Sequence, residues 1–523
     1  MRAFTLSVRK FTHAEPFGAR IPIPNSPAVS AVARGTYVAL DDFRRNQKGH
    51  ILRCVISQAL LPAGKLDLHA KKIAMRKTLI AKYHQSLARD DGLTSEFFAR
   101  LKTMMRERRL IYGSREISHA LRPHFLTSRQ FAILTHSSEV LAGAFEKVAN
   151  ALLSDPSRMQ TVGLTEREIK LALVEPRQST SVKTSRLDAF VHGYEVKFVE
   201  YNAENPSSLA DQEGLNEILC EVTAMRNMAQ QYELRQFSTA RRLLRMLLDT
   251  FREWGGTGVP NIAILDWDGL PTAPEFALLA DLFASHGVAT VICTPEQLQY
   301  ENGRLRCGAF AIDLVYKRVI INELLAACAD SHPLIRAYIA GDVCLVNSFR
   351  CKMVHKKAVF ELLTDKANAN WFTAREKDVV RRTVPWTRRV TQRKTDYRGV
   401  EVDLIEYIRK HPRQFVIKPN DDYGGRGVSF GEGARSSEWD AALSEALAGD
   451  YVVQEKIELQ TEIFPIFSES SWDLQPMYVD TNPFLFNGRV GGAMVRLSGS
   501  PVVNVTAGGS ETGFFVVAGE NRR

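Results

Sequence analysis

An apolar strand that delivers a lysine to a glycine-rich loop is the clearest chemical pattern in the chain. Residues 415–419 read Phe-Val-Ile-Lys-Pro, and Gly424, Gly425 and Gly427 follow shortly after. Glycine lets backbone N–H groups approach phosphate oxygens closely, and a lysine supplies positive charge for the same oxygens. Because glycine-rich turns are common for purely structural reasons, Lys418 on its strand must carry the prediction of a phosphate site.

A second apolar strand ends in an acidic segment suited to hold a nucleotide base. Residues 451–457 read Tyr-Val-Val-Gln-Glu-Lys-Ile. The order of lysine strand, glycine-rich loop and Val-Gln-Glu-Lys hinge resembles the ATP-grasp family. The resemblance implies that Lys418 contacts phosphates. It also implies that Glu455 and Ile457 lie at the adenine hinge, with Glu462 as a candidate ligand of the ribose hydroxyls.

The resemblance implies a second phosphate-binding lysine on the preceding helix. Residues 354–360 read Val-His-Lys-Lys-Ala-Val-Phe and offer Lys356 and Lys357. We predict Lys357 as the nucleotide ligand. A solvated helix charge is the alternative for either lysine.

A late arginine is predicted to stabilise the transferred phosphoryl group. Residues 488–496 and 504–509 resemble the family's arginine strand and the loop that follows it. By this resemblance Arg496 supplies a fixed guanidinium where negative charge is redistributed, which is the main catalytic need in phosphoryl transfer. The alternative is a surface charge on a strand.

The metal-binding motif expected after that loop stands near residue 200 instead. Residues 186–188 read Arg-Leu-Asp, and residues 199–205 read Val-Glu-Tyr-Asn-Ala-Glu-Asn. This order is similar to that of glutathionylspermidine synthetase and related circularly permuted ATP-grasp proteins. In them, the metal-binding segment precedes the nucleotide-binding half.

Three oxygen-bearing side chains and one arginine make up the predicted metal site. Alternate residues of a strand share a face, so Glu200 and Asn202 can present oxygens to one Mg²⁺ ion. The resemblance assigns Asp188 as the third ligand and Arg186 as an arginine that reaches the reacting phosphate. The alternative is a set of surface polar groups, because the following Asn-Pro is a turn pattern.

The elements that must position these residues predict an α/β protein with an ATP-grasp fold in circularly permuted order. Five parts are expected: a basic, flexible extension (1–74), a helical region (75–164), the metal-binding part (165–257), a Rossmann-like unit (258–350) and the nucleotide-binding part (351–523).

Hydrophobic periodicity predicts the individual elements within these parts. Apolar residues three and four apart predict helices around 97–105 and 141–152. Other predicted helices are 236–254, 274–286, 321–341 and 352–365, and the predicted strands are 171–174, 196–199, 261–265, 288–292 and 312–316.

The positive charge is concentrated at the start of the chain. The net charge is +9, yet residues 1–74 hold twelve Lys/Arg against four Asp/Glu, which leaves 56 basic and 55 acidic residues in 75–523. A basic nucleic-acid footprint on the main body is therefore not expected. An Arg-rich start also fits a transit peptide, but without an amphipathic repeat we favour a flexible extension or an over-long gene start ahead of Met75.

Composition excludes several other classes of protein. Apolar residues make up 45% of the chain, but none of their runs approaches the ~20 residues needed to span a bilayer, so no membrane contact is predicted. Seven scattered cysteines without CxxC spacing favour a reducing cytoplasm. No Cys/His amidase region and no activated Ser or Cys pattern is present, so hydrolase activity is not expected.

These observations predict an ATP- and Mg²⁺-dependent ligase that joins a small-molecule carboxylate to an amine, such as a peptide or polyamine, through an acyl phosphate. Lys317 and Arg318 are candidate substrate contacts at the end of an apolar run. Three alternatives stay open. They are an ATP-grasp kinase that releases a phosphorylated product, a non-catalytic nucleotide-binding protein, and a nucleic-acid binder that depends on residues 1–74.

Overall fold

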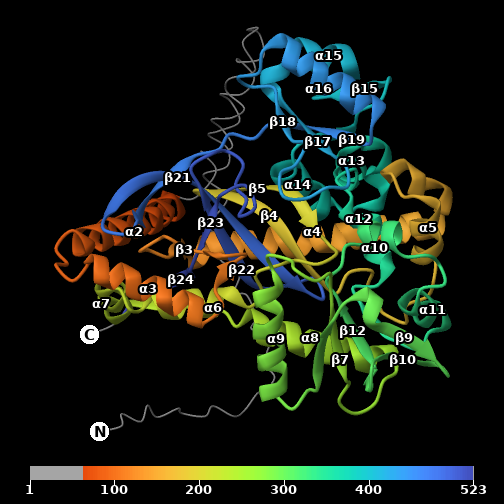
Figure 1. Ribbon diagram of the computed structural model, residues 1–523. Helices are drawn as coiled ribbons and strands as arrows, with labels where there is room; N and C mark the ends of the chain where they lie inside the picture. The colour runs from red at the N-terminus through yellow and green to blue at the C-terminus, as the bar shows by residue number, and fades with distance from the viewer. Residues whose placement is uncertain (1–62, 522–523) are drawn as a thin grey trace, which may run out of the picture. The chain divides into compact units, whose positions relative to one another are not determined.

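The computed structural model describes residues 63–521, with side chains from residue 74 onward (Figure 1). The chain divides into a unit of residues 1–70 and a unit of residues 71–523. Everything below concerns the second unit, apart from the first turns of α2 (Ala63–Leu87). The extension predicted at 1–74 therefore lies almost entirely outside the described residues.

A largely antiparallel sheet joins two distant parts of the sequence. Its strand order is β23-β22-β21-β4-β5, with β20 paired to β21. The strands are β4 (Thr184–His192), β5 (Glu195–Asn202), β20 (Thr461–Phe467), β21 (Trp472–Phe486), β22 (Arg489–Ser498) and β23 (Ser510–Thr512). Because β21 pairs with β4, the predicted metal-binding segment and the predicted arginine strand lie in one sheet.

A long buried helix, α4 (Ser128–Ser154), packs against this sheet. A capping box of Thr127 and Gln130 begins the helix, because each side chain satisfies a backbone N–H group that the first turn leaves free. Phe145 of α4 stacks on Tyr201 of β5 with ring centroids 4.1 Å apart. The helix predicted around 141–152 is confirmed by α4, and the helix predicted around 97–105 is confirmed by α3 (Ser95–Glu107).

A parallel sheet forms a second layer, with strand order β13-β12-β7-β8. It contains β7 (Ile262–Leu265), β8 (Thr290–Cys293), β12 (Leu314–Lys317) and β13 (Cys344–Val346). Helices α8 (Thr239–Trp254) and α9 (Ala273–Ser285) pack their apolar faces on it, in a core that includes Leu247, Ile264 and Leu279. The predicted strand–helix–strand pattern is confirmed at the level of its elements.

A four-stranded antiparallel sheet carries the glycine-rich loop. Its order is β14-β19-β17-β18, and its strands are β14 (Thr387–Arg389), β17 (Phe415–Pro419), β18 (Ser429–Phe430) and β19 (Tyr451–Glu455). Helices α15 (Leu404–Lys410) and α16 (Ser436–Ala448) cover one face, in a core with Phe415 and Trp439 (Figure 1).

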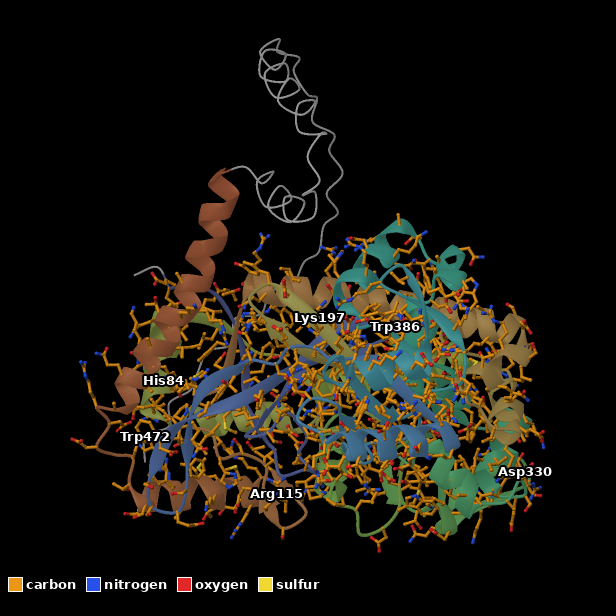
Figure 2. All side chains as sticks on the ribbon, turned by 90° about the horizontal axis from the view of Figure 1, so that it is seen from above. His84, Arg115, Lys197, Asp330, Trp386 and Trp472 are labelled. Atoms are coloured by element: carbon orange, nitrogen blue, oxygen red, sulfur yellow. The ribbon has the colours of Figure 1, made fainter. Side chains whose placement is uncertain are left out.

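The last described strand closes the fold. β24 (Phe514–Glu520) lies between β3 (His124–Thr127), to which it is parallel, and β6 (Tyr232–Arg235). Side chains fill the space between sheets and helices throughout (Figure 2). Among the described residues, none of the helices has the length and apolar character required to cross a membrane.

The remaining elements are short. The strands are β1 (Ile111–Tyr112), β2 (Arg115–Glu116), β9 (Leu298–Glu301), β10 (Arg304–Cys307), β11 (Phe310–Ile312), β15 (Lys394–Tyr397) and β16 (Val400–Asp403). The α-helices are α5 (Glu166–Ala172), α6 (Asp211–Leu219), α7 (Thr223–Gln231), α10 (Ile321–Ala327), α11 (Pro333–Ala340), α12 (Lys352–His355), α13 (Val359–Thr364) and α14 (Ala374–Thr383). The 3₁₀ helices are η2 (Pro156–Val162), η3 (Pro295–Gln297), η4 (Phe349–Cys351), η5 (Lys366–Trp371) and η6 (Pro412–Gln414).

Three predicted elements differ from the structure. The strand predicted at 171–174 is wrong, because a capping box of Thr165 and Glu168 begins α5 there. The helix predicted at 321–341 is two helices, since Pro333 begins a new one. The helix predicted at 352–365 is broken at Lys356, whose backbone is extended.

Candidate active site

Four of the predicted site residues project from one face of β4 and β5. Arg186 lies directly opposite Asn202, and Asp188 lies directly opposite Glu200. Directly opposed residues of an antiparallel pair point to the same side of the sheet. The strand pairing therefore brings together Arg186, Asp188, Glu200 and Asn202, as the alternation of the sequence predicted.

Asp188 is the centre of this group. Arg186 Nε donates to Asp188 Oδ1 at 2.8 Å, and Asn202 Nδ2 donates to the same oxygen at 3.0 Å. Burial raises the pKa of Asp188, but the guanidinium groups of Arg186 and Arg496 outweigh it and lower the pKa to about 2. The carboxylate is therefore ionised at neutral pH, which is the form that binds metal ions.

Arg496 connects β22 to this group and to a residue that the sequence analysis missed. Its Nη2 lies 2.7 Å from Asp188 Oδ2, and its Nε donates to Asp480 Oδ2 at 2.9 Å. Asp480 faces Arg496 across the β21–β22 pair and is fully buried. The only pattern that pointed to Asp480 is a polar Asp-Thr-Asn run within an otherwise apolar strand.

The glycine-rich loop between β17 and β18 uses its glycines for shape. Gly424, Gly425 and Gly427 have φ angles of 74°, 78° and 64°, in the left-handed region that favours glycine. A Cβ atom on Gly425 would lie 2.8 Å from Val502 Cγ1, and one on Gly427 would lie 2.7 Å from Pro419 Cγ. The loop therefore depends on glycine at these positions.

Lys418 lies on β17 as a half-buried cation without a carboxylate partner. Its Nζ donates to Gln454 Oε1 at 2.7 Å and forms no salt bridge within residues 74–521. Burial and the neighbouring Lys357 lower its pKa to about 8, against the opposing effect of Glu200. Binding of an anion such as phosphate would compensate this charge.

The two adjacent lysines at the break between α12 and α13 have different surroundings. Lys357 Nζ lies 3.2 Å from Glu200 Oε1 and donates to the backbone oxygen of Asp422 at 2.6 Å. Lys356 Nζ is instead bonded to Glu168 at 2.9 Å. The structure therefore places Lys357 with the other site residues and Lys356 away from them, although neither lies on a helix as predicted.

A first cavity, with an empty volume of about 910 Å³, lies between the glycine-rich loop and β4–β5. One part of its lining is apolar, namely Val416, Val428, Phe430, Ile457 and Leu459. The other part is charged, namely Asp188, Glu200, Lys357, Lys418, Arg426, Asp480 and Arg496. An apolar part for a flat base, beside a part that offers four cations for phosphates and carboxylates for a metal ion, suits a nucleotide.

Of the three predicted adenine and ribose ligands, two line the first cavity and the third does not. Glu455 and Ile457 line the first cavity, just where β19 ends. Glu462 lines neither this cavity nor its neighbour, because its carboxylate is bound by Arg76 and by Arg122, whose Nη2 lies 2.7 Å away. The structure therefore gives no support to Glu462 as a ribose ligand.

A second cavity adjoins the first, with an empty volume of about 1710 Å³. It is bordered by α6, α9, β22 and β23, and Arg318 contributes to its lining while Lys317 does not. Lys317 Nζ instead donates to the backbone oxygen of Val319 in the core at 3.1 Å. The two cavities share part of their lining, namely Asp188, Glu200, Tyr423, Arg426, Arg496 and Asn504.

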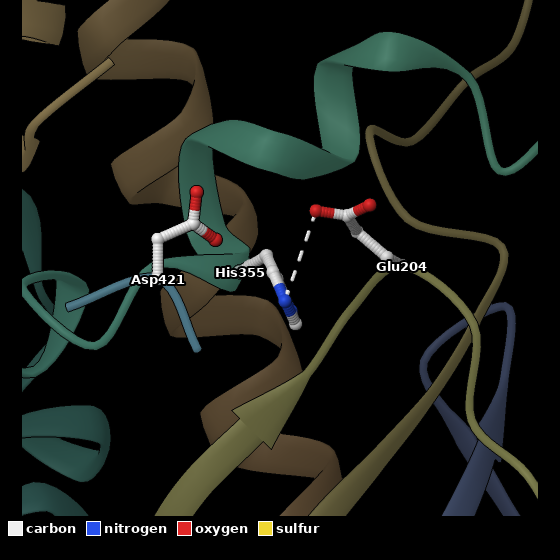
Figure 3. Close-up of side chains that lie close together, drawn as sticks. All are labelled: Glu204, His355 and Asp421. Atoms are coloured by element: carbon white, nitrogen blue, oxygen red, sulfur yellow. Dashed lines mark ion pairs between the residues drawn. The ribbon is translucent and has the colours of Figure 1, made fainter. Parts of the chain in front are cut away.

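A buried ionic network anchors the start of the glycine-rich loop. Lys352 Nζ lies 2.6 Å from Glu204 Oε1 and 2.7 Å from Asp421 Oδ1. His355 Nε2 lies 3.7 Å from the same Glu204 oxygen (Figure 3). Glu204, His355 and Asp421 lie close enough to hold a metal ion, but the Lys352 ammonium bridges the two carboxylates, with Lys317 beside Glu204 and Lys356 beside Asp421. The network therefore acts as a structural tie between the segment that follows β5 and the loop.

The donor set of β4–β5 fits a magnesium ion better. Asp188, Glu200 and Asn202 offer two carboxylates and an amide oxygen, the hard oxygen ligands that Mg²⁺ prefers. Lys357 and Arg496 contact these carboxylates, so phosphate oxygens entering the first cavity would find cations at the same place.

Comparison with known proteins finds sequence relatives that match only part of the chain. No family model matches the chain. A putative glutamate–cysteine ligase 2-3 of Frankia alni is 28% identical over 273 residues, which are 48% of this chain and 29% of that protein. An uncharacterized protein, Rv2411c of Mycobacterium tuberculosis, is 34% identical over 127 residues, or 22% of each chain. The chain thus spans less than a third of the curated relatives that it matches.

The solved structures include a similar fold. A glutathione synthetase-like effector, GSS30 of Globodera pallida, superposes with a TM-score of 0.54 at 12% identity. The superposition covers 82% of this chain and 98% of that one. The described chain therefore has a mixed α/β fold that is similar to that of a glutathione synthetase-like protein.

Proposed function

We propose that the protein is an ATP-dependent carboxylate–amine ligase on an ATP-grasp fold whose halves stand in permuted order. The observation that carries the proposal is the lining shared by the two cavities, which includes Asp188, Glu200 and Arg496. A nucleotide in the first cavity and a carboxylate in the second would meet at these residues. The pairing of β4 with β21, which in turn pairs with β22, supports the permuted order, because it places the early strand of Asp188 and the late strand of Arg496 in one sheet.

In this proposal the first cavity binds ATP. The apolar end receives adenine beside Glu455 and Ile457, and Lys357 and Lys418 hold the phosphates over the glycine-rich loop. Lys418 is suited to this task because it lines the cavity half-buried and has no carboxylate partner among the described residues.

The reaction then requires a charged centre that is already organised. A substrate carboxylate oxygen attacks the terminal phosphorus while the bond to ADP breaks, and an acyl phosphate results. The amine nitrogen next attacks the acyl carbon, the bond to phosphate breaks, and the nitrogen loses a proton. Arg186 and Arg496 stabilise the negative charge on the transferred group, since both are held in place by Asp188. Mg²⁺ held by Asp188, Glu200 and Asn202 would neutralise phosphate charge and align the transfer.

The names of the relatives support amide-bond formation and suggest the first substrates to test. One sequence relative is named as a glutamate–cysteine ligase, and the structural neighbour is named as glutathione synthetase-like. L-Glutamate and L-cysteine are therefore the first carboxylate and amine to supply, ahead of a wider panel of amino acids and polyamines.

The first experiment measures Mg²⁺-dependent ATP binding by calorimetry on the full chain. Lys418→Ala removes a charged phosphate contact, worth about 1.5–3 kcal/mol, so Kd is expected to rise about 10- to 100-fold. Glu200→Ala is expected to abolish most of the Mg²⁺ dependence. Matched controls are Lys410→Ala on α15 and Glu195→Ala on β5, whose side chains are exposed and line neither cavity.

The outcomes separate the parts of the proposal. Wild-type Kd in Lys418→Ala would remove the nucleotide site from the first cavity, and unchanged Mg²⁺ dependence in Glu200→Ala would disconnect β5 from it. Product analysis with ATP then distinguishes a ligase, which releases an amide, from a kinase, which releases a stable phosphorylated substrate.

A further inference from the structure

Two buried carboxyl groups lie together in the lining of the second cavity and have no role in the scheme above. Asp211 is the first residue of α6, and Glu511 is the middle residue of β23. Ser208 Oγ donates to Glu511 Oε1 at 2.6 Å, and Ser208 and Asp211 line the same cavity. A third carboxylate, Glu275, faces the same cavity from α9.

One oxygen of this group has no partner. Glu511 is 2% exposed, yet its Oε2 makes no hydrogen bond to any described residue. A buried polar atom of a charged group without a partner is costly, so it indicates a missing ligand more strongly than an exposed carboxylate would.

Three of the four arginines that line the second cavity are paired with other carboxylates, and the fourth, Arg426, lies over the ring of Tyr423. Arg496 contacts Asp188 and Asp480, and Arg318 Nη2 lies 3.5 Å from Glu275. Arg186 is likewise paired with Asp188. Within residues 74–521, neither carboxyl group of the Asp211–Glu511 pair takes part in a salt bridge.

The electrostatics of the pair point in the same direction. Burial, with a smaller contribution from Glu275, raises the pKa of Glu511 to about 7 against the opposing effects of Ser208, Arg186 and Arg496. Burial and then Glu511 itself raise the pKa of Asp211 well above its usual range. A cation placed between the two carboxyl groups would relieve both effects.

We propose that the space before Asp211, Glu511 and Ser208 receives the ammonium group of the amine substrate. This rests on the proposed function, which it deepens by naming the substrate class as a primary amine. An ammonium group has three N–H donors and no acceptor, which matches two carboxyl groups and a hydroxyl oxygen. A metal ion fits less well. Among the described residues, the carboxylate oxygens of Asp211, Glu275 and Glu511 do not all lie close enough to one another to bind one ion.

The position of the pair suits a reacting amine. Glu511 lies directly opposite Arg496 in the β22–β23 ladder. Opposed residues of an antiparallel pair have Cβ atoms about 5 Å apart. An ammonium group bound at Glu511 would therefore lie within one side-chain length of the arginine that is proposed to hold the transferred phosphate. Before the nitrogen attacks the acyl carbon, the ammonium group passes one proton to the Glu511 carboxylate and becomes the neutral amine.

The test compares ligand-induced thermal stabilisation of the full chain by 1,4-diaminobutane and by the neutral isostere 1,4-butanediol, each at equal ionic strength set with NaCl. The variants are Glu511→Gln and Asp211→Asn, which keep size and remove charge. The control is Glu217→Gln, an exposed carboxylate on the same helix α6. Kd for Mg²⁺-ATP is measured on every variant by calorimetry.

The diamine is expected to raise the Tm of the parent and of Glu217→Gln. In Glu511→Gln and Asp211→Asn, this rise in Tm should be at least threefold smaller. The Kd for Mg²⁺-ATP of these two variants should stay within twofold of the parent's. An undiminished shift in Glu511→Gln and Asp211→Asn, an equal shift with the diol, or no shift in a parent that binds Mg²⁺-ATP would each overturn the inference. If the parent does not bind Mg²⁺-ATP, the proposed function itself is refuted.

Discussion

At the scale of single residues, Glu204 is the carboxylate around which the buried ionic network is organised. It is fully buried and accepts from Lys352 Nζ at 2.6 Å and from the backbone N–H of Ile321 at 2.7 Å. Lys317 approaches the same carboxylate at 3.7 Å, while Lys352 also contacts Asp421 at 2.7 Å. Glu204 is thus the carboxylate that both buried ammonium groups share.

Replacing this carboxylate should be strongly destabilising. Glu204→Gln leaves Lys352 short of one charge and Lys317 unpaired, so the free energy of unfolding is expected to fall by about 3–5 kcal/mol. Urea denaturation monitored by tryptophan fluorescence measures this change. Asp440→Asn, which breaks an exposed pair with Arg409, should cost less than about 1 kcal/mol. Equal costs for the two variants would contradict the assignment of the network.

Glu462 should contribute to acid unfolding. Burial raises its pKa, but Arg76 and Arg122 outweigh burial, and the folded-state pKa lies well below the usual range of glutamate. A lowered folded-state pKa means that its stabilisation is present above the unfolded-state pKa and is lost as the pH falls toward the folded-state value. Glu462→Gln should therefore reduce stability at pH 7 and flatten the loss of stability below about pH 4.5. A parallel shift of the whole pH–stability curve would be the contrary result.

The residues that could be predicted from the sequence are those within short motifs. Glu200 and Asn202 share a face because alternation along one strand decides it, and the family resemblance of the Arg-Leu-Asp motif supplied Asp188. Asp480 and Glu511 could not be predicted, since each has meaning only through a strand partner that pairs with it in the folded chain.

At the scale of elements, the shape of the glycine-rich loop depends on glycine at fixed positions. Gly427→Ala should place a Cβ atom against Pro419 and force alanine into a left-handed conformation that costs about 1–2 kcal/mol. Displacement of the loop is expected to raise the Kd for ATP about five- to tenfold in calorimetry. Gly433→Ala is the matched control, because Gly433 has a similar φ of 81° but open space around it and lines neither cavity.

Most elements followed from local periodicity, and the errors have local causes. α9 was predictable because its apolar spacing and its first-turn proline agree. The apolar run at 171–174 was ambiguous in period, and the cap at Thr165 decided in favour of a helix. Pairing between distant strands, such as β21 with β4, leaves no trace in local periodicity.

At the scale of the whole molecule, β24 is the element that completes the fold. It buries Phe514, Phe515, Val516 and Val517 between β3 and β6. Burial of four such side chains contributes about 6–12 kcal/mol, which is comparable to the whole stability of a typical domain. A chain ending at residue 513 should therefore lack a cooperative thermal transition in circular dichroism. A chain ending at residue 521 is the control and should melt as the parent does.

The parallel pairing of β24 with β3 has a consequence during synthesis on the ribosome. β3 leaves the ribosome early, but its partner strand is made only after almost four hundred further residues. Until then, one edge of β3 stays open to other chains. Contacts between such distant segments also slow folding, because a long loop must close before they form. The nascent protein therefore passes through a long period in which its sheet is incomplete and general chaperones are expected to bind it.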